Sequence, residues 1–355
     1  MNINVTLTKT PKEKPTGTLG FCKYYTDHMF LMNYSTEKGW YNPRIEPYGP
    51  IALSPATTVF HYGQAIFEGM KCYRGHDGKI RFFRPMDNFK RMNDSADRIC
   101  MPHLDMDMAM EGLKELVKID QSWIPTEKGT SLYIRPTLIG TDPYLGVKAS
   151  DTYLFFIILS PVGSYYAKGL NPVSIYVEDV YSRTACGVGG TGAAKFGGNY
   201  GSSLKASYEA KHKGFDQVLW LDSNEKKYIE EVGAMNICFV IDGKIVTPDL
   251  DGSILPGITR NSIVNLARAL GYTVEERKIS VDELVEAAEN KKLQEMFGTG
   301  TAAVVSPVGK FSYKGKEYVI GDGGIGKITQ NLYDRLTSIQ NGLEPDIKNW
   351  VYIMD

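Results

Sequence analysis

One lysine lies in a stretch of the sequence that carries almost no other charge or side-chain bulk. The segment GVGGTGAAKFGGNYGSS, residues 187–203, holds seven glycines, and Lys195 is its only charged residue. Residues this small let a backbone approach a flat group closely. A lysine that is taken out of water there favours its neutral amine, which can form a Schiff base with an aldehyde. The segment therefore predicts a reactive amine.

Two nucleotide-binding interpretations of the same glycines fail on their context. A P-loop needs Ser or Thr after its lysine, whereas Phe196 follows Lys195. Residues 187–192 fit the dinucleotide pattern G-x-G-x-x-G, but no buried strand precedes them and His212 stands near where an acidic residue is needed. A flexible surface loop remains an alternative, although such a loop would normally carry more charge. Pyridoxal phosphate is the commonest flat aldehyde that needs a lysine of this kind.

The elements around this segment predict an α+β (mixed α/β) chain of two domains. The first 160 residues read mostly as strands, including residues 56–84 around a turn at 75–78, with helices over residues 87–100 and from an N-cap at Asp105. Gly and Pro cluster near residues 163–172, which predicts an N-terminal domain over 1–167, a linker over 168–181 and a C-terminal domain over 182–355 that carries Lys195.

The second half continues with alternating helices and strands. A helix is expected over residues 200–211, a hairpin over 242–243, a helix closed by Gly271, and a helix that begins at a capping box of Ser280 and Glu283.

Composition excludes several other classes of protein. The net charge is -1, from 40 basic and 41 acidic residues, so no positive footprint for nucleic acid is expected. The 5 cysteines are scattered without the spacing of zinc ligands or of a disulfide framework, and we expect no metal. No apolar run is long enough for a membrane span or a signal peptide. We therefore expect a cytoplasmic protein.

Several motifs in the right order resemble one family. AAKFGGNYGSS, EEVGAMNICFV, LPGITRNSI and FGTGTAAVVSPVG in the second half, with HYGQAIFEGMKCYRG, SLYIRPTLIG and FFIILSPVGSYY in the first, are similar to the branched-chain-amino-acid aminotransferases. The likeness covers residues 25–308. It implies the two-domain fold type IV of pyridoxal-phosphate enzymes, with pyridoxal 5'-phosphate in the cleft between the domains.

The resemblance also implies roles around the cofactor ring. Lys195 would form the Schiff base and then move the proton between the substrate's α-carbon and the cofactor. Glu231 would contact the pyridine nitrogen and keep it protonated, with the neighbouring Glu230 as the competing candidate. Tyr200 would hydrogen-bond the ring oxygen.

The phosphate would be held by groups from several elements. Ile258 and Thr259 begin a helix, whose N-terminal amides and dipole favour an anion. Thr301 resembles the hydroxyl donor of the family, and Arg91 resembles its phosphate arginine.

The remaining matches concern substrates. Tyr25, Phe67 and Tyr200 would line an apolar pocket, while Tyr62 and the amides of Ala234 and Ala302 would take the α-carboxylate. Tyr133 and Arg135 would receive the second carboxylate of glutamate or 2-oxoglutarate. Val147 and Tyr165 would reach the neighbouring subunit's pocket, which implies a homodimer.

The expected reaction is ping-pong transamination of L-leucine, L-isoleucine and L-valine with 2-oxoglutarate, giving branched-chain 2-oxo acids and L-glutamate. A D-amino-acid aminotransferase or an aminodeoxychorismate lyase of the same fold type is the alternative within the fold. An NAD-dependent oxidoreductase and a non-catalytic binding protein are the alternatives outside it. The sequence departs from the family pattern in two ways, at three positions. Ala303 and Ser306 replace the redox Cys-x-x-Cys of animal relatives, and Ala234 replaces a common threonine.

Overall fold

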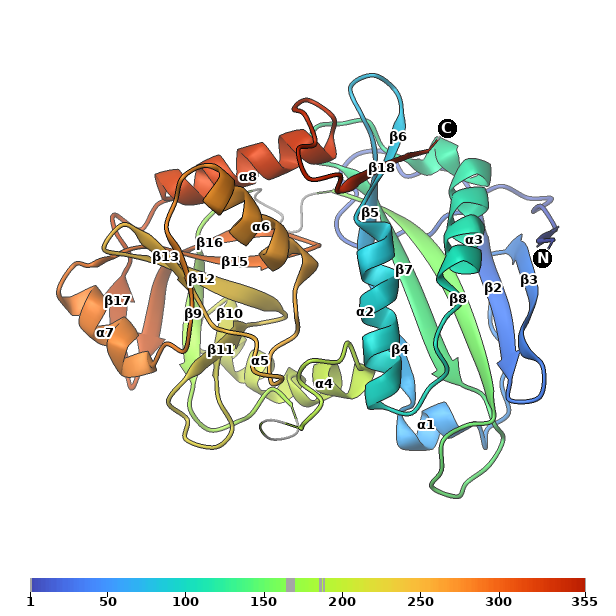
Figure 1. Ribbon diagram of the computed structural model, residues 1–355, viewed down its shortest axis with the longest axis horizontal. Coiled ribbons are helices and arrows are strands. Elements are labelled where there is room, and N and C mark those ends of the chain that lie inside the picture. Colours follow the sequence, from blue (N-terminus) through green and yellow to red (C-terminus); the bar gives the residue numbers. More distant parts are fainter. Residues whose placement is uncertain (1, 164–169, 185–186, 188, 355) are drawn as a thin grey trace. The chain divides into compact units, whose positions relative to one another are not determined.

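The chain forms two compact units that its sequence order does not separate cleanly. The computed structural model describes residues 2–163, 170–184, 187 and 189–354 (Figure 1). Unit 1 comprises Met1–Ala167, Ala194–Gly197 and Ile339–Asp355, and unit 2 comprises Lys168–Ala193 and Gly198–Ser338. Lys195 therefore belongs to unit 1, although the chain on both sides of it belongs to unit 2. The expected assignment of Lys195 to the C-terminal domain differs from this because sequence order does not reveal which unit binds its backbone.

Unit 1 is built on one sheet with the strand order β1-β3-β2-β8-β7-β5-β6-β18, and β4 pairs with β7. Apart from the parallel β1–β3 pair, its pairings are antiparallel. The strand β18 comes from the C-terminal end of the chain and covers the edge at β6. The strands of this sheet are β1 (Asn4–Val5), β2 (His28–Ser35), β3 (Gly39–Pro47), β4 (Ala65–Phe67), β5 (Met70–Arg74), β6 (Ile80–Phe83), β7 (Ser131–Gly140), β8 (Thr152–Val162) and β18 (Val351–Met354).

Two helices, α2 (Pro85–Arg98) and α3 (Met106–Ile119), cover one face of this sheet (Figure 1). Their apolar faces pack on alternate strand residues, so that Phe89 and Leu113 meet Phe30 and Phe155 in the core. The carboxylate of Asp105 caps α3 by accepting from the Met108 N–H at 3.0 Å, which confirms the predicted start. Short helices α1 (Thr58–Tyr62) and η1 (Gln121–Trp123) complete unit 1.

Unit 2 contains a second sheet, with the order β11-β10-β9-β16-β15-β12-β13-β14 and β17 beside β16. A further pairing of β11 with β12 closes the strands from β11 to β12 into a ring. The strands are β9 (Val173–Glu178), β10 (Gln217–Leu221), β11 (Ile229–Val232), β12 (Met235–Ile241), β13 (Lys244–Thr247), β14 (Val274–Glu276), β15 (Leu293–Gly300), β16 (Val304–Tyr313) and β17 (Lys316–Val319). The helices are α4 (Gly197–Ser202), α5 (Leu204–His212), α6 (Ile258–Ala269), α7 (Val281–Glu289) and α8 (Lys327–Gln340).

Several expectations are wrong in detail. The predicted linker over 168–181 contains β9, which pairs with β10 and β16. Its alternating apolar residues outweigh the preceding Gly and Pro. The residues of α1 were expected in a strand, but contacts with a neighbouring loop hold them as one helical turn: the Thr58 N–H donates to the Asp142 carbonyl, and the Thr58 and Ser150 hydroxyls are 3.1 Å apart. The helix expected over 200–211 is divided into α4 and α5 at Ser203.

The other predicted elements of the second half are present. The hairpin over Asp242 and Gly243 joins β12 to β13. One half of the capping box forms, since the Ser280 hydroxyl accepts from the Glu283 N–H at 3.0 Å.

The glycine-rich stretch is packed against its own unit at Gly192. A Cβ placed on this residue would lie 1.7 Å from the Ser253 carbonyl oxygen. The Arg183 side chain donates to the carbonyls of both Gly192 (3.3 Å) and Ser253 (2.8 Å), which ties the two backbones together. Close approach of two backbones, rather than of a backbone to a ring, thus explains the absence of a side chain here.

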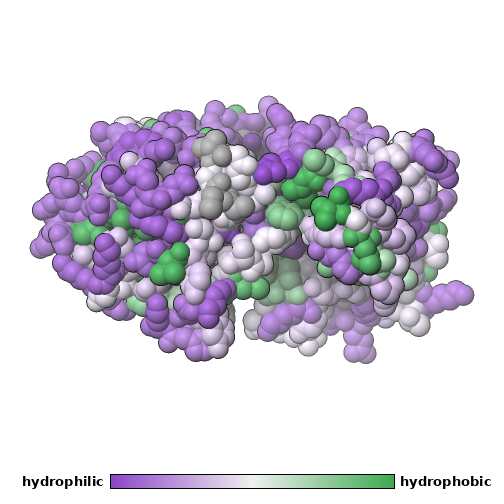
Figure 2. Space-filling model, turned by 90° about the horizontal axis from the view of Figure 1, so that it is seen from below, coloured by the Kyte–Doolittle hydropathy of each residue, from purple (hydrophilic) through white to green (hydrophobic). Residues whose placement is uncertain are grey.

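Exposed apolar side chains gather on one face of unit 1, around α1 and the loop that follows β7. Phe60, Leu145 and Val147 are 61%, 59% and 85% exposed. Figure 2 shows hydrophobic residues grouped on this face. Contiguous exposed apolar groups often mark an interaction site.

Among the described residues, no helix combines the length and apolar character that a membrane span requires.

The packing at Gly192 predicts an asymmetric response to alanine. We expect Gly192→Ala to lower the free energy of unfolding by about 3 kcal/mol, because the new methyl group overlaps the Ser253 backbone. Gly201→Ala, in α4, meets nothing within 4 Å and should be neutral or stabilising by up to about 1 kcal/mol. Urea denaturation of both variants checks this. Equal effects at the two positions would refute the close approach.

Candidate active site

Both backbone groups of Lys195 are bound by elements of unit 1. Its N–H donates to the Ser95 hydroxyl at 2.8 Å, and its carbonyl accepts from the Phe67 N–H at 3.1 Å. The next residue, Phe196, forms an antiparallel bridge with Ile66. Helix α2 and strand β4 thus hold the lysine segment from two directions, and the half-buried side chain places its Nζ 4.9 Å from the centre of the Phe67 ring.

The predicted substrate residues of β7 lie beside the same ring. The Arg135 guanidinium carbon is 4.7 Å from the Phe67 ring centre, and the Arg135 Nη2 donates to the Tyr133 hydroxyl at 3.0 Å. A Cβ on Gly69 would lie 2.1 Å from that hydroxyl, so only glycine leaves room for it. Unit 1 therefore brings together Lys195, Phe67, Tyr133 and Arg135. An amine, an aromatic ring and a guanidinium in this arrangement can bind a substrate that carries a carboxylate.

Arg91 is buried in α2 and makes a two-pronged ion pair with Glu68. Its Nε and Nη2 each lie 2.7 Å from one oxygen of the Glu68 carboxylate, which is fully buried. The same carboxylate accepts from the Gly69 N–H at 3.1 Å. Paired contacts of this type fix the plane of a guanidinium. Glu68 is therefore a residue of the site that motif reasoning missed, and it orients the predicted phosphate arginine.

A second buried cation lies next to Tyr133. Lys71 of β5 is opposite Tyr133 in the strand register, and partners in an antiparallel pair point to the same face. Ser160 of β8 is opposite Tyr133 on the other side. Burial lowers the pKa of Lys71 to about 8, and the nearby Cys22 opposes this shift. Burial raises the pKa of the Cys22 thiol, against the influence of Arg135.

In unit 2, Glu231 is buried on β11, where it has one main-chain donor and one ion-pair partner. One of its oxygens accepts from the Leu255 N–H at 2.8 Å, and the other lies 3.3 Å from Nε of the buried Arg183. The competing Glu230 lines a different hollow of about 100 Å³, where Asp249 and Asp251 also lie, and burial raises the pKa of Glu230. The two neighbouring glutamates therefore have different surroundings, and Glu231 has those of a carboxylate held in one orientation.

The start of α6 offers main-chain donors for an anion. Gly257 is its N-cap, and no side chain caps it, so its first amides are not satisfied by a capping residue. A Cβ on Gly257 would lie 1.9 Å from the amide oxygen of Asn236. Asn236 is opposite Thr299 in the register of β12 and β15, and within the described residues the buried Thr299 hydroxyl oxygen has no hydrogen-bond partner. Thr299, two residues before the predicted Thr301, is a second residue that the motifs missed.

The remaining predicted residues lie at several places. Tyr200 is on α4 of unit 2, and Ala234 lies in the turn after β11. Because Asn236 pairs with Thr299, this turn lies at the same sheet edge as the turn that holds Thr301 and Ala302. In unit 1, Tyr25 stacks on Tyr48 with ring centres 5.1 Å apart. Tyr62 donates to the Leu145 carbonyl near the exposed Val147, and Tyr165 lies outside the described residues.

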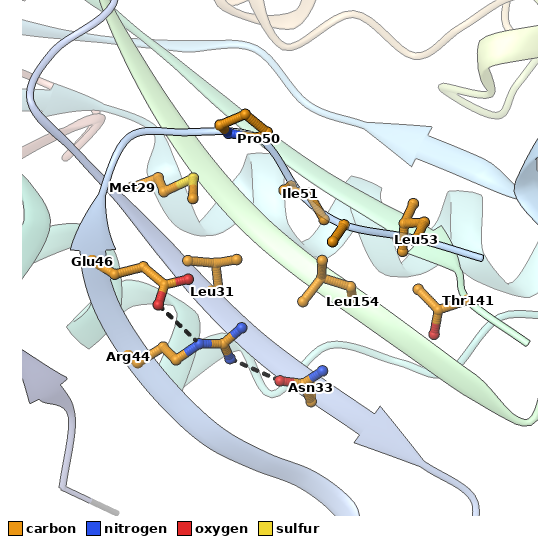
Figure 3. A pocket seen from close by; sticks show the side chains of 11 residues that line it. Met29, Leu31, Asn33, Arg44, Glu46, Pro50, Ile51, Leu53, Thr141 and Leu154 are labelled. Carbon is orange, nitrogen blue, oxygen red and sulfur yellow. Dashed lines mark hydrogen bonds and ion pairs between the residues drawn. The ribbon is translucent and has the colours of Figure 1, made fainter. Parts of the chain in front are cut away.

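A hollow of about 250 Å³ lies elsewhere on unit 1, between β2, β3, β8 and residues 50–53 (Figure 3). Its floor is aliphatic, with Met29, Leu31 and Leu154, and its charged side chains are paired with each other: Arg44 lies 3.5 Å from Glu46. None of the predicted site residues lines it. Among the described residues, no group of three or more His, Cys, Asp or Glu side chains is placed to hold a metal ion.

Comparison with known proteins agrees with these features. The model of the family "Amino-transferase class IV" matches residues 65–311. A Bacillus subtilis protein named branched-chain-amino-acid aminotransferase 2 is 54% identical over 99% of this chain and 96% of its own. The Escherichia coli branched-chain amino acid aminotransferase structure is 28% identical, with a TM-score of 0.77 over 93% of this chain and 99% of its own. A T.th. branched-chain amino acid aminotransferase complexed with N-(5'-phosphopyridoxyl)-L-glutamate is 27% identical, with a TM-score of 0.76 over 92% of this chain and 98% of its own.

The buried Lys71 predicts a specific dependence of stability on pH. Its folded-state pKa of about 8 lies below the ordinary lysine value of about 10.4, so between these two values the unfolded chain binds more protons. The unfolding free energy of the wild type, minus that of Lys71→Met, should therefore rise by roughly 1–3 kcal/mol as pH increases through this window. The exposed Lys118→Met is the control. Parallel stability curves for wild type and Lys71→Met would contradict the burial of a charged amine.

Proposed function

The chain belongs to the class IV amino-transferases, among which its relatives are branched-chain-amino-acid aminotransferases, and from this premise we propose that it uses pyridoxal 5'-phosphate bound to Lys195. In this proposal it moves the amino group of L-leucine, L-isoleucine or L-valine to 2-oxoglutarate, giving the branched-chain 2-oxo acids and L-glutamate. The observation that carries the proposal is the placement of Lys195, whose backbone is fixed on both sides next to Phe67, with Arg135 at the same ring.

The residues present fit this cofactor. The buried Thr299 hydroxyl, which lacks a partner among the described residues, is a donor that a phosphate oxygen could accept from. The start of α6, which no side chain caps, adds main-chain amides and the positive end of a helix dipole. We propose that Ile258, Thr259, Thr301 and Arg91 hold the phosphate together with Thr299. Glu231 would hold the ring nitrogen, and Tyr200 the ring oxygen. When bound, pyridoxal phosphate supplies an aldehyde that takes up the amino group and a ring that accepts electrons from the substrate's α-carbon.

Each side chain then has a limited task. The Lys195 amine would take the proton from the substrate's α-carbon and deliver it to the carbon of the cofactor that is bonded to the transferred nitrogen. This requires the amine to stay within reach of both carbons. Its backbone hydrogen bonds in unit 1 restrict where the amine can move. The ring of Phe67 gives the amine an apolar neighbour that excludes water from one side.

The proposed substrate pocket must accept both an apolar and an acidic side chain. Tyr25, Phe67 and Tyr200 would contact the branched side chain, while Tyr62 and the amides of Ala234 and Ala302 would bind the α-carboxylate. Tyr133 and Arg135 would take the second carboxylate of glutamate. The hydrogen bond between them, and the apolar face of Phe67 under the guanidinium, fix that charge at one place. The side chain of leucine would occupy the same volume without needing the charge of Arg135.

A homodimer is part of the proposal. Val147 is 85% exposed and lies in the exposed apolar group near α1, as expected of a residue that reaches another subunit. Together with Tyr165, it would contribute to the partner's pocket. Burial of Phe60 and Leu145 against a second copy would remove apolar surface from water.

Replacing Arg135 separates the two halves of the reaction. We expect Arg135→Met to slow the glutamate half-reaction by about ten- to a hundredfold, because a charge-assisted hydrogen bond is lost. The leucine half-reaction should change by less than about threefold, because leucine has no second carboxylate. Stopped-flow absorbance of the cofactor measures each half separately, since amino-acid and 2-oxo-acid steps can be run alone.

Arg44→Met, on the same sheet but away from the site residues, is the matched control and should leave both halves unchanged. If Arg135→Met slows both halves by the same factor, Arg135 supports the fold or the cofactor instead. If the wild type transfers no amino group from any branched-chain amino acid, the substrate assignment is wrong.

A further inference from the structure

The Ser95 hydroxyl makes two hydrogen bonds that connect α2 to the lysine segment. It donates to the Arg91 carbonyl one turn earlier in the helix, at 3.0 Å. Since the hydroxyl has one hydrogen, its lone pairs remain to accept, and one of them takes the Lys195 N–H at 2.8 Å. Ser95 is fully buried. Water therefore cannot replace the hydroxyl without a rearrangement of the core around it.

The helix that carries Ser95 is itself fixed at the same turn. Arg91 is held by both oxygens of the buried Glu68. The apolar face of α2, with Phe89 and Met92, packs into the core of unit 1. The hydrogen bond from the Lys195 N–H to the Ser95 hydroxyl thus attaches the lysine backbone to a rigid element. It also sets the backbone of Lys195 at a constant place relative to Arg91.

The lysine segment needs such a tie because of its own sequence. Between residues 168 and 338, only the segment Ala194–Gly197 belongs to unit 1, and the chain before and after this segment belongs to unit 2. Within the segment, Ala194 and Gly197 have little or no side chain that could anchor it by packing, which leaves Phe196 as its one large apolar side chain. Hydrogen bonds to its backbone therefore help to restrain the segment, and Ser95 supplies a side-chain acceptor for one of them.

We propose that Ser95 is a positioning residue for the reaction, which fixes the Lys195 amine by holding the Lys195 backbone N–H to helix α2. This inference rests on the proposed function of Lys195. In this inference Ser95 acts through the Lys195 backbone, which its hydroxyl contacts, and not by contact with substrate or cofactor. Its effect should appear in the rate of proton transfer, where a displacement of about 1 Å can cost about a hundredfold. Substrate affinity should change little.

The test compares three substitutions of Ser95 in the full-length chain. Ser95→Ala removes the acceptor, Ser95→Cys keeps nearly the same volume with a weak acceptor, and Ser95→Thr keeps the hydroxyl. Ser207→Ala is the matched control, because Ser207 also bonds the carbonyl four residues earlier in its helix but does not contact the lysine segment. Hydrogen exchange of the Lys195 amide, followed by mass spectrometry on the cofactor-free and the cofactor-loaded chain, directly measures how well the hydrogen bond to Ser95 protects this amide.

We expect amide exchange at Lys195 to be about ten- to a hundredfold faster in Ser95→Ala and Ser95→Cys. The kcat of the leucine half-reaction should fall by a similar factor, with KM within about threefold. Ser95→Thr and Ser207→Ala should resemble the wild type in both measurements. If the added methyl group of Ser95→Thr prevents folding, the near-isosteric Ser95→Cys still distinguishes loss of the acceptor from loss of packing.

Unchanged exchange at Lys195 in both Ser95→Ala and Ser95→Cys would overturn the inference, whatever the activity. Faster exchange with an unchanged kcat would also overturn the inference, because the hydrogen bond would then restrain the backbone without affecting the reaction. A wild type that performs no transamination while its Lys195 amide still depends on Ser95 would instead contradict the proposed function.

Discussion

Lys195 is tied through its backbone to unit 1, and the placement of the other groups of that unit follows from this tie. The N–H is bonded to helix α2 and the carbonyl to strand β4. Those two elements also carry Arg91 and Phe67. The amine, the ring beside it and the guanidinium of α2 are thus set by one frame of helix and strand, rather than by the glycine-rich chain on either side of the lysine. The glycines serve to let that chain pass close to its own unit, as at Gly192.

Buried charge imposes the second constraint. Taking a charge out of water costs several kcal/mol unless a partner compensates. Each unit meets this demand with a glutamate and an arginine: Glu68 with Arg91 in unit 1, and Glu231 with Arg183 in unit 2. Such pairs add little net stability, but they hold polar groups in one orientation. Groups that must hold a cofactor benefit from that fixed orientation more than from extra stability.

The sequence predicted the enzyme class and those elements whose signals are local. Asp105 and Ser280 each accept a hydrogen bond from an amide three residues later, as their spacing indicates. The family resemblance rested on motifs that specify chemistry, and family membership agrees with it.

The features that could not be predicted from the sequence depend on contacts between residues that are far apart in the chain. Ser95 and Lys195 are 100 residues apart, and the Glu68–Arg91 pair joins a loop to a helix, so neither contact leaves a pattern in the local sequence. Strand β9 was hidden by Gly and Pro next to it, and the assignment of Lys195 to unit 1 depends on hydrogen bonds that only the fold creates.

The central claim is that Lys195, and no other lysine, carries the cofactor. The direct measurement is borohydride reduction of the full-length chain loaded with pyridoxal phosphate, followed by proteolysis and mass mapping of the pyridoxyl group. The account predicts the label on Lys195 and loss of stable labelling in Lys195→Ala. A label on Lys205, Lys211 or the buried Lys71, with Lys195 unmodified, would contradict it.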